Sequence, residues 1–231
     1  MKNGTSINAI AKDLAKASPG SERYPFALGL PDLVTESTVA TKRFQPLEGI
    51  AANELVVTPQ VMLDLFTPAE CARIVQTCGS HPLHAGQLVQ ERENYRRASA
   101  AWIVPDDDTR WVYERIATMV AKLNGWYRYE LFGFLEPLHF IRYDEGGKFD
   151  WHLDCGGDRT CTRKLSITVQ LSPPEDYAGG GLEFCPQGEL HRSRYQGAAT
   201  VFPSMLAHRV TPVERGPRHS IVAWIHGPSF R

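Results

Sequence analysis

Residues 142–154 read RYDEGGKFDWHLD, and this stretch holds the pattern from which the fold of the chain can be inferred. Asp144-Glu145-Gly146-Gly147 is typical of a tight turn between two strands, because glycine reaches backbone conformations that other residues avoid. His152 and Asp154 follow the turn and are two positions apart. Side chains at that spacing lie on the same side of an extended strand, so the pattern places an imidazole beside a carboxylate.

Short apolar runs that are typical of strands fill the C-terminal half of the chain. They cover residues 131–143, 165–171, 182–184, 198–202 and 220–225. Within 165–171, apolar residues alternate with Ser166, Thr168 and Gln170, so one face of this strand is predicted to be apolar and the other to line a polar cavity. Many short strands separated by turns predict a β-sandwich or barrel.

Two helices are predicted before these strands. The first covers Thr67 to Gly79, where Thr67 and Glu70 form a capping box and Pro68 suits the first turn. The second covers Thr109 to Leu123, where apolar residues recur every three or four positions, and Asn124-Gly125 is predicted to end it. Helices followed by many strands indicate an α+β fold.

Composition excludes several classes of protein. The 231 residues are 42% hydrophobic, which is enough to build a core, and 26 acidic residues nearly cancel 25 basic ones. Because no block of like charge is present, we expect neither a broad nucleic-acid-binding face nor a polybasic membrane anchor. The sequence contains no apolar run of signal-peptide or membrane-spanning length, and its five cysteines lack the spacing of a disulfide framework. A soluble, cytoplasmic protein with free thiols is predicted.

The chain is predicted to contain one folded domain and an extension. Residues 1–53 are mostly irregular in pattern, and they are predicted to form an N-terminal extension that is a lid, an arm or a partly mobile tail. Residues 54–231 are predicted to form the single domain.

A third candidate ligand, His208, lies near the end of the chain, and Arg218 and Ser220 follow it. Two imidazoles and one carboxylate would leave three coordination positions of a metal open, which suits Fe(II) oxygen chemistry better than a closed structural zinc site. If two adjacent strands joined by a turn carry His208 and Arg218, the guanidinium lies in the same pocket. There it can hold a carboxylate by a bidentate pair.

With these motifs in order, the sequence resembles the 2-oxoglutarate-dependent Fe(II) dioxygenases of the prolyl 4-hydroxylase type, especially the bacterial branch called PKHD-type hydroxylases. The resemblance runs from about Val61 to Ile225. It depends on residues 142–154, the Gly179-Gly180-Gly181-Leu182 turn, His208 and Arg218-His219-Ser220. It implies a double-stranded β-helix, or jelly-roll, core with flanking helices.

The resemblance also implies roles for individual residues. The iron ligands of the family match His152, Asp154 and His208. Arg218 matches the residue that grips the C5 carboxylate of 2-oxoglutarate, with Ser220 as its hydroxyl helper. Tyr143 occupies the position of a tyrosine that reaches the same cosubstrate; the alternative is a strand-end tyrosine with its hydroxyl in solvent.

Four further residues are expected in this pocket. From the strand alternation, Thr168 and Gln170 would face the cavity, and Leu182 and Val210 would pack on the carbon chain of the cosubstrate. For all four, ordinary packing in the core or the cavity wall remains the alternative.

The implied activity is hydroxylation of an unactivated C–H bond, with decarboxylation of 2-oxoglutarate to succinate. The implied cofactor is Fe(II), with 2-oxoglutarate and O2 as cosubstrates and ascorbate as a reductant. We expect a small-molecule substrate, amino acid-like or a specialised metabolite, because residues 1–53 precede the core and no basic face is present. The alternatives are a hydroxylase of a protein residue and a metal-binding jelly roll without redox turnover. A nucleic-acid demethylase is disfavoured because no basic stripe is interleaved with aromatic residues.

Other polar residues in the same half of the chain fit packing better than chemistry. We expect His139 to pack in the core or at the rim, His219 to face outward, and His226 to lack a supporting partner. Arg96-Arg97 lies in a strand-like stretch, residues 95–104. One of the two could reach a substrate carboxylate, but an exposed strand edge is favoured.

Overall fold

The structure of the chain, a computed structural model, describes residues 57–85, 95–157 and 159–229. The predicted N-terminal extension, residues 1–53, lies outside the described residues. Its boundary with the domain stays a prediction.

The larger of two facing sheets has seven antiparallel strands in the order β1-β11-β7-β14-β5-β4-β2. In chain order their bounds are β1 Gln60–Met62, β2 His84–Ala85, β4 Ser99–Ile103, β5 Leu138–Tyr143, β7 Arg163–Gln170, β11 Ala199–Pro203 and β14 Arg218–His226.

The smaller sheet has five strands in the order β10-β9-β12-β6-β3. Their bounds are β3 Arg96–Arg97, β6 Lys148–His152, β9 Leu182–Phe184, β10 Gly188–Glu189 and β12 His208–Val210. β8 Ala178–Gly179 and β13 Val213–Arg215 pair as a separate ribbon. Of two 3-10 helices, η3 Arg159–Thr162 precedes β7 and η4 His191–Arg194 follows β10.

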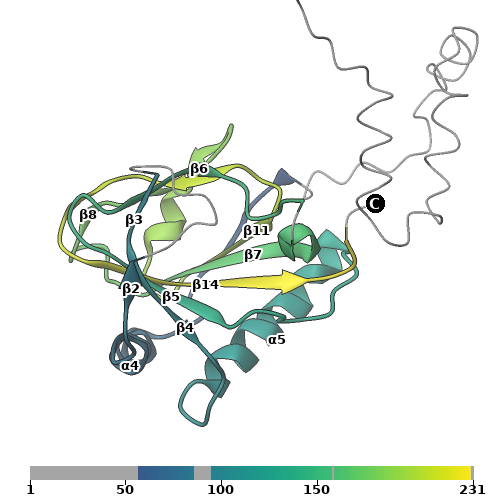
Figure 1. Cartoon of the computed structure of the whole chain (residues 1–231), viewed down its shortest axis with the longest axis horizontal. Coiled ribbons are helices and arrows are strands. Elements are labelled where there is room, and N and C mark those ends of the chain that lie inside the picture. Colours follow the sequence, from purple (N-terminus) through teal and green to yellow (C-terminus); the bar gives the residue numbers. More distant parts are fainter. Residues whose placement is uncertain (1–56, 86–94, 158, 230–231) are drawn as a thin grey trace, which may run out of the picture. The chain divides into compact units, whose positions relative to one another are not determined.

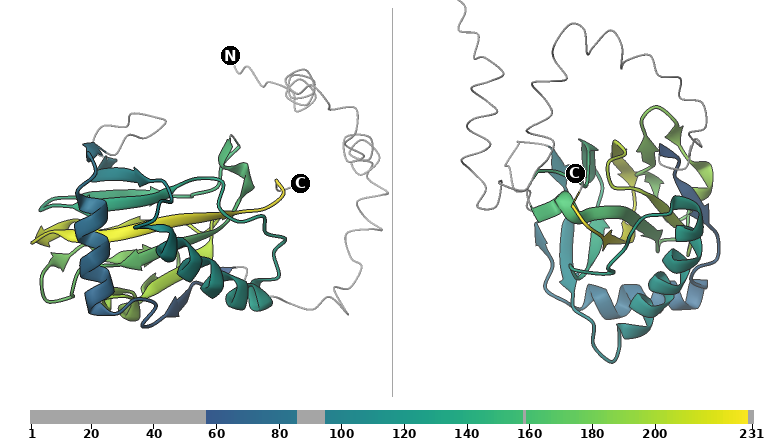
Figure 2. Two further views of the ribbon diagram at one scale, coloured as in Figure 1. Left: turned by 90° about the horizontal axis from the view of Figure 1, so that it is seen from below. Right: turned by 90° about the vertical axis from the view of Figure 1, so that its right-hand side faces the viewer.

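Two α-helices, α4 Pro68–Gly79 and α5 Arg110–Tyr127, lie against the outer face of the larger sheet (Figures 1 and 2). The smaller sheet lies on the other side of the larger one (Figure 1). The arrangement is a double-stranded β-helix with flanking helices, so the predicted α+β jelly roll is confirmed. None of the helices in the described part of the chain is both long and apolar enough to cross a lipid bilayer.

Strand β7 has one face toward the helices and the other toward the space between the two sheets. Leu165, Ile167 and Val169 are fully buried against the helices, in a cluster with residues of α4 and α5. Burying each such side chain contributes roughly 1.5–3 kcal/mol, so this face holds the sheet to the helices. The intervening polar residues, of which Ser166 is one, point between the two sheets, as the alternation predicted.

Helix α4 begins as predicted. The backbone N–H of Glu70 donates to the hydroxyl of Thr67 at 3.3 Å, and the carboxylate of Glu70 accepts from the backbone N–H of Thr67 at 2.8 Å. Both halves of the capping box are therefore present. The buried face of the helix, which packs toward the sheet, consists of Cys71, Ile74 and Cys78.

Helix α5 continues past Asn124-Gly125, so its predicted end was wrong. Its last residue, Tyr127, is buried, and its hydroxyl lies 3.0 Å from the backbone oxygen of Val201 in β11. The side-chain amide of Asn124 forms hydrogen bonds with the backbone oxygen and N–H of Tyr129. The helix therefore ends about one turn later than expected. Contact with a distant strand therefore decides where this helix ends.

The predicted strand over residues 131–143 is also shorter than expected. β5 begins at Leu138, directly after Pro137, which has no N–H to donate to a neighbouring strand. Gly133 has a φ of +114° and makes only an isolated bridge with His226.

All five cysteines are free thiols.

Replacing Thr67 by alanine tests the capping box. Thr67→Ala removes the acceptor for the N–H of Glu70, so the free energy of unfolding should fall by about 1 kcal/mol. Chemical denaturation followed by circular dichroism measures this change. Thr118→Ala is the matched control, because the hydroxyl of Thr118 bonds only the carbonyl of Glu114 inside α5 and its loss should change stability by less than about 0.5 kcal/mol. Equal stability of the two variants would contradict the role of the cap.

Candidate metal centre

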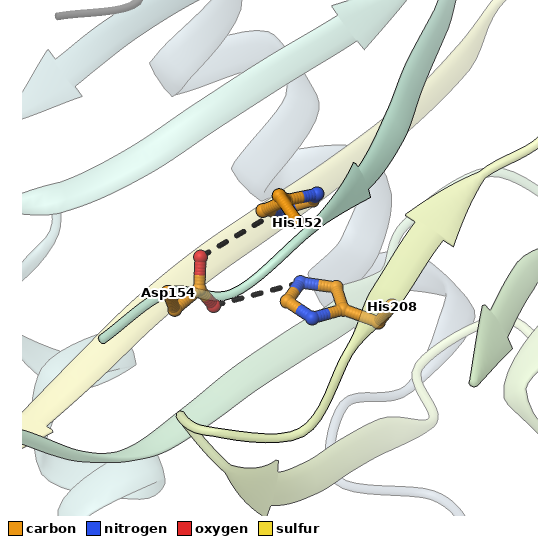
Figure 3. A group of neighbouring side chains, drawn as sticks. All are labelled: His152, Asp154 and His208. Atoms are coloured by element: carbon orange, nitrogen blue, oxygen red, sulfur yellow. Dashed lines mark ion pairs between the residues drawn. The ribbon is translucent and has the colours of Figure 1, made fainter. Parts of the chain in front are cut away.

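Three side chains from the smaller sheet converge between the sheets. His152 ends β6, Asp154 follows it, and His208 begins β12, directly opposite His152 in the pairing of the two strands. Nε2 of His152 lies 3.7 Å from Oδ1 of Asp154, and Nε2 of His208 lies 3.6 Å from Oδ2 (Figure 3). Of the described residues, only these three form a group of His, Cys, Asp or Glu donors that could hold a metal, with all donor atoms within 4.8 Å.

A β-bulge in β6 shapes this centre. His208 pairs with His152, but Val210 pairs with Phe149, so β6 has one residue more than β12 over this interval. The extra residue lets Phe149 and His152, which are three positions apart, face the same side. Their rings stack with centroids 3.6 Å apart, so Phe149 forms a wall behind the first imidazole.

Both imidazoles are held by backbone carbonyls. Nδ1 of His152 donates to the oxygen of Asp150 at 2.8 Å, and Nδ1 of His208 donates to the oxygen of Leu206 at 3.0 Å. A carbonyl oxygen only accepts, so the proton of each neutral ring is on Nδ1 and the lone pair of Nε2 is free. The two Nε2 atoms that face Asp154 are thus prepared as metal donors.

Asp154 is fixed by the strands on the opposite side of the cavity. The hydroxyl of Ser166 in β7 donates to Oδ2 of Asp154 at 2.6 Å, and Ser204 lies 3.0 Å from Ser166. Because the single proton of Ser166 is directed at the carboxylate, Ser204 must donate to Ser166. The backbone N–H of Asp154 also donates to the oxygen of Ser204 at 3.0 Å.

The charge states of these groups suit a cation. Burial, assisted by the nearby His208, lowers the pKa of His152 to about 4, so its ring is neutral at neutral pH. Burial alone would raise the pKa of Asp154, but His208, His152 and the hydroxyl of Ser166 outweigh it, and the pKa lies below its usual value. The centre therefore presents a neutral nitrogen donor on His152 and a carboxylate on Asp154, with Nε2 of His208 beside that carboxylate.

These donors fit a divalent metal. Bonds of about 2.0–2.2 Å from one ion require its donor atoms to lie within about 4.4 Å of one another. The two distances from the Nε2 atoms to Asp154 meet this requirement. The two Nε2 atoms lie within 4.8 Å of each other, and small movements of the imidazoles would bring this third distance into range. Two nitrogens and one oxygen on one side of an ion are typical of non-haem Fe(II) sites with open positions.

A second feature, Arg218 at the start of β14, faces the same interior from the larger sheet. Only 3% of its surface is exposed, and its Nε and Nη1 atoms are buried without a hydrogen-bond partner. Within residues 57–85, 95–157 and 159–229, no carboxylate forms an ion pair with it. A buried guanidinium in this state is costly unless an anion joins it, so the position predicts an anionic ligand.

The other residues expected around Arg218 lie on the neighbouring strands. Tyr143 pairs with Arg218 across β5 and β14, is buried rather than at a solvent-exposed strand end, and has its ring 5.6 Å from the guanidinium. Ser220 pairs with Gln170, whose Oε1 is buried without a partner. Thr168 is the next inward residue of β7, between Gln170 and the residue that holds Asp154.

Leu182 and Val210 face each other across β9 and β12. Both are buried in the cluster between the sheets, together with Tyr143. The ten residues expected from the sequence thus line one interior. One expectation was wrong: His208 and Arg218 are not on adjacent strands joined by a turn, because β13 lies between them in sequence and they belong to opposite sheets.

The glycines of the Gly179-Gly180-Gly181 turn allow close packing beside Arg218. Gly180 has a φ of +60°, and a Cβ atom there would lie 3.0 Å from Cδ of Arg218 and 2.9 Å from Cγ2 of Val213. A side chain at this position would therefore disturb the guanidinium that closes the pocket.

Comparison with known proteins agrees with this geometry. The model of the 2OG-Fe(II) oxygenase superfamily matches residues 138–226, a range that includes all ten residues. Over these residues the chain is similar to this superfamily. Curated relatives are PKHD-type hydroxylases: that of Crocosphaera subtropica is 34% identical over 96 residues, which are 40% of this chain and 43% of the relative. That of Thermosynechococcus vestitus is 31% identical over 144 residues, 60% of this chain and 58% of the relative.

Solved structures show the same fold at low sequence identity. A prolyl-4-hydroxylase of Pseudomonas putida aligns with a TM-score of 0.61 and 21% identity, covering 74% of this chain and 93% of its own. A prolyl hydroxylase of Trichoplax adhaerens, in complex with a peptide of hypoxia inducible factor, aligns with a TM-score of 0.62 and 17% identity, covering 75% and 88%. The chain spans less than half of the length of the Crocosphaera relative, and the solved structures, at 21% and 17% identity, show the fold alone.

Other histidines of the described residues lie outside the centre. His139 is buried and stacks on Trp102, as predicted, and His219 lies on the other face of β14 beside Phe140. His226 is not part of the donor group, as expected, and its Nδ1 lies 2.9 Å from the hydroxyl of Thr162.

The favoured interpretation of Arg96-Arg97 was wrong in part. Arg97 is exposed, but Arg96 is half-buried and its Nε has no partner. Ser166 was not singled out as a contact of the centre, although its place in the same alternating row as Thr168 and Gln170 was a usable signal.

Replacing Ser166 by alanine tests how Asp154 is held. Ser166→Ala leaves one oxygen of Asp154 without its donor, and such losses around metal ligands typically weaken metal binding by roughly 10- to 100-fold. Equilibrium dialysis of the purified protein with Mn(II) measures the dissociation constant. Ser193→Ala, a buried serine of η4, should bind Mn(II) as the unmodified protein does. Unchanged affinity in Ser166→Ala would show that Asp154 does not need this hydrogen bond.

Proposed function

We propose that this protein is a Fe(II)- and 2-oxoglutarate-dependent hydroxylase of a small molecule. The observation that carries the proposal is a pair of features in one interior: the donors of His152, Asp154 and His208, and the buried, unpartnered guanidinium of Arg218. The first fits a divalent metal with open positions, and the second fits the far carboxylate of a dicarboxylic acid.

His152, Asp154 and His208 would hold Fe(II). When bound, Fe(II) with 2-oxoglutarate supplies the oxidising chemistry, in which one atom of O2 enters a substrate C–H bond as hydroxyl, the other enters succinate, and CO2 leaves. The task of the protein residues is to position these reactants and exclude water. Phe149 and the apolar residues between the sheets provide the dry surroundings.

Arg218 would bind the C5 carboxylate of 2-oxoglutarate. Ser220 and Gln170 lie beside it in register, and the row of inward residues in β7 leads from Gln170 to Ser166 at the metal centre. Four residues of a strand span about 13 Å, a gap that the side chains at both ends and a five-carbon diacid can fill. Leu182 and Val210 provide apolar surface for the carbon chain.

A metal-binding module without turnover is the second candidate. It would need only the three donors, and it gives no reason for a buried guanidinium that lacks an anion. Arg218 therefore favours the enzyme. A protein residue is the alternative substrate, and the Trichoplax neighbour, which was solved with a bound peptide, is the observation in its favour.

Succinate formation tests the proposed reaction. With Fe(II), 2-oxoglutarate and O2 together, the protein should form succinate above the background without protein, and omission of any one of them should abolish it. Mass spectrometry of the reaction mixture measures the product. Asp154→Ala should be inactive, whereas His191→Ala, at an exposed position of η4, should act as the unmodified protein does. Metal binding without succinate under any condition would identify the module instead.

Replacing Arg218 tests the assignment of the cosubstrate pocket. Arg218→Ala removes the partner of a buried carboxylate, so the affinity for 2-oxoglutarate should fall by about 2–5 kcal/mol, with Arg218→Lys between the two. Calorimetric titration of the Mn(II)-loaded protein with 2-oxoglutarate measures the change. Arg215→Ala removes the same charge from an exposed position of β13 and serves as the control. Similar affinities for Arg218→Ala and Arg215→Ala would place the cosubstrate elsewhere.

A further inference from the structure

Arg96 is a second arginine whose buried donor has no partner, and it lies near the metal centre. It belongs to β3, the edge strand of the smaller sheet, where it pairs with Phe149 of β6. Its guanidinium lies over the ring of Phe149, 4.8 Å from the centroid, and Phe149 stacks in turn on His152. One aromatic ring thus separates Arg96 from a candidate metal ligand.

The electrostatic influence of Arg96 reaches groups on both sheets. Burial lowers the pKa of His139 to about 3, and the positive charge of Arg96 is the next cause. Burial raises the pKa of Tyr143, and the charge of Arg96 opposes this rise. The same charge contributes to the lowered pKa of His152. The guanidinium lies over Phe149, and this ring packs against the apolar cluster between the sheets, so Arg96 is directed toward that interior.

Five other arginines of the described residues are neutralised by acids. The ion pairs are Arg115–Glu70, Arg142–Asp144, Arg163–Glu136, Arg194–Glu189 and Arg209–Glu183. In contrast, no carboxylate of the described residues pairs with Arg96, and its Nε is buried without an acceptor. Arg218 is the other arginine with buried, unpartnered nitrogens, and the proposed function gives it 2-oxoglutarate. Arg96 is thus left without an anion.

An aromatic wall formed by Trp102, His139 and Trp224 lies in the same part of the interior. The ring of Trp102 stacks on His139 at 4.3 Å, and Trp224 lies 6.0 Å from both rings. Trp224 pairs with Ser166, the residue that holds Asp154, so the wall is at the metal end of the cavity rather than at the Arg218 end.

Two properties of this wall point to a ligand. Half of the surface of Trp102 is exposed, so the wall begins at the solvent and leads inward to the buried Trp224. Nε1 of Trp224 is a buried donor without a partner. Arg163 stacks on Trp224 at 3.8 Å, but its guanidinium is already used by Glu136 and by the backbone oxygen of Asp154.

We infer that Arg96 binds a carboxylate of the primary substrate, whose apolar part packs on the wall of Trp102, His139 and Trp224. This inference rests on the proposed function and specifies its substrate class: a carboxylic acid with an apolar portion that is positioned for oxidation at the metal. Nε1 of Trp224 is available as a further donor to a polar group of that substrate. Arg96 is a specificity-determining residue, and its task differs from that of Arg218.

Matched pairs of carboxylates and amides test the inference. The probes are free L-α-amino acids with their α-amides, and blocked peptides that contain Asp or Glu with the same peptides containing Asn or Gln. Binding is measured by calorimetry on the full-length protein loaded with Mn(II) and 2-oxoglutarate without O2, and on the Fe(II) enzyme the acceleration of succinate formation by each probe is measured. The unmodified protein should prefer at least one carboxylate to its amide by roughly 30-fold or more.

Arg96→Gln should remove this preference, and Arg96→Lys should retain part of it because the charge remains. Arg97→Gln is the matched control: Arg97 is the next residue of β3, is exposed and should leave the preference unchanged. Thermal unfolding of each variant separates loss of binding from loss of folding, and Arg96→Lys carries the comparison if Arg96→Gln does not fold.

The two probe sets distinguish the source of the carboxylate. An Arg96-dependent preference among free amino acids identifies a small acid, and one among the peptides identifies a protein side chain. Absence of any carboxylate preference, or its persistence in Arg96→Gln, would overturn the inference. If the unmodified protein forms succinate but does not need Arg96, only this inference fails. If it forms no succinate at all, the proposed function itself fails.

Discussion

The pairing of β6 with β12 is the constraint on which the metal centre depends. It places His208 opposite His152, and the hydrogen bond from the backbone of Asp154 to Ser204 brings the carboxylate between them. The bulge in β6 is part of the same arrangement, because it turns Phe149 inward beside His152. A shift of this register by one residue would turn the inward side chains of one strand to its other face and separate the donors.

Apolar burial on the outer face of the larger sheet offsets the stability lost by placing polar side chains on its inner face. Its outer face packs apolar side chains of β7, β11 and β14 on the two helices, and this core includes many of the fully buried residues of the domain. The inner face can then carry Ser166, Thr168 and Gln170, which contribute little to hydrophobic stability. Buried donors and acceptors left unpaired there destabilise the protein until a ligand satisfies them, as is expected where binding rather than stability determines the residue.

Local patterns in the sequence predicted much of the fold and most of the site. The capping box of α4, the alternation in β7 and the two-residue spacing of His152 and Asp154 depend only on neighbours in the chain. The order of motifs then supplied His208 and Arg218 by resemblance. Three features escaped because distant residues decide them: the end of α5 at Tyr127, the bulge in β6, and the placement of His208 and Arg218 on opposite sheets.

The net charge of the chain, −1, conceals a local excess of positive charge in the interior. Fe(II) held by one carboxylate and two neutral imidazoles would carry a single positive charge, and Arg218 and Arg96 each add another. Doubly charged 2-oxoglutarate balances two of these three charges, and one remains on Arg96. Because uncompensated charge in a buried site is destabilising, the most favourable loaded state is one in which the substrate brings one negative charge. Whether an arginine in a strand faces this interior or the solvent depends on its register with Phe149, which is why the sequence could not separate Arg96 from Arg97.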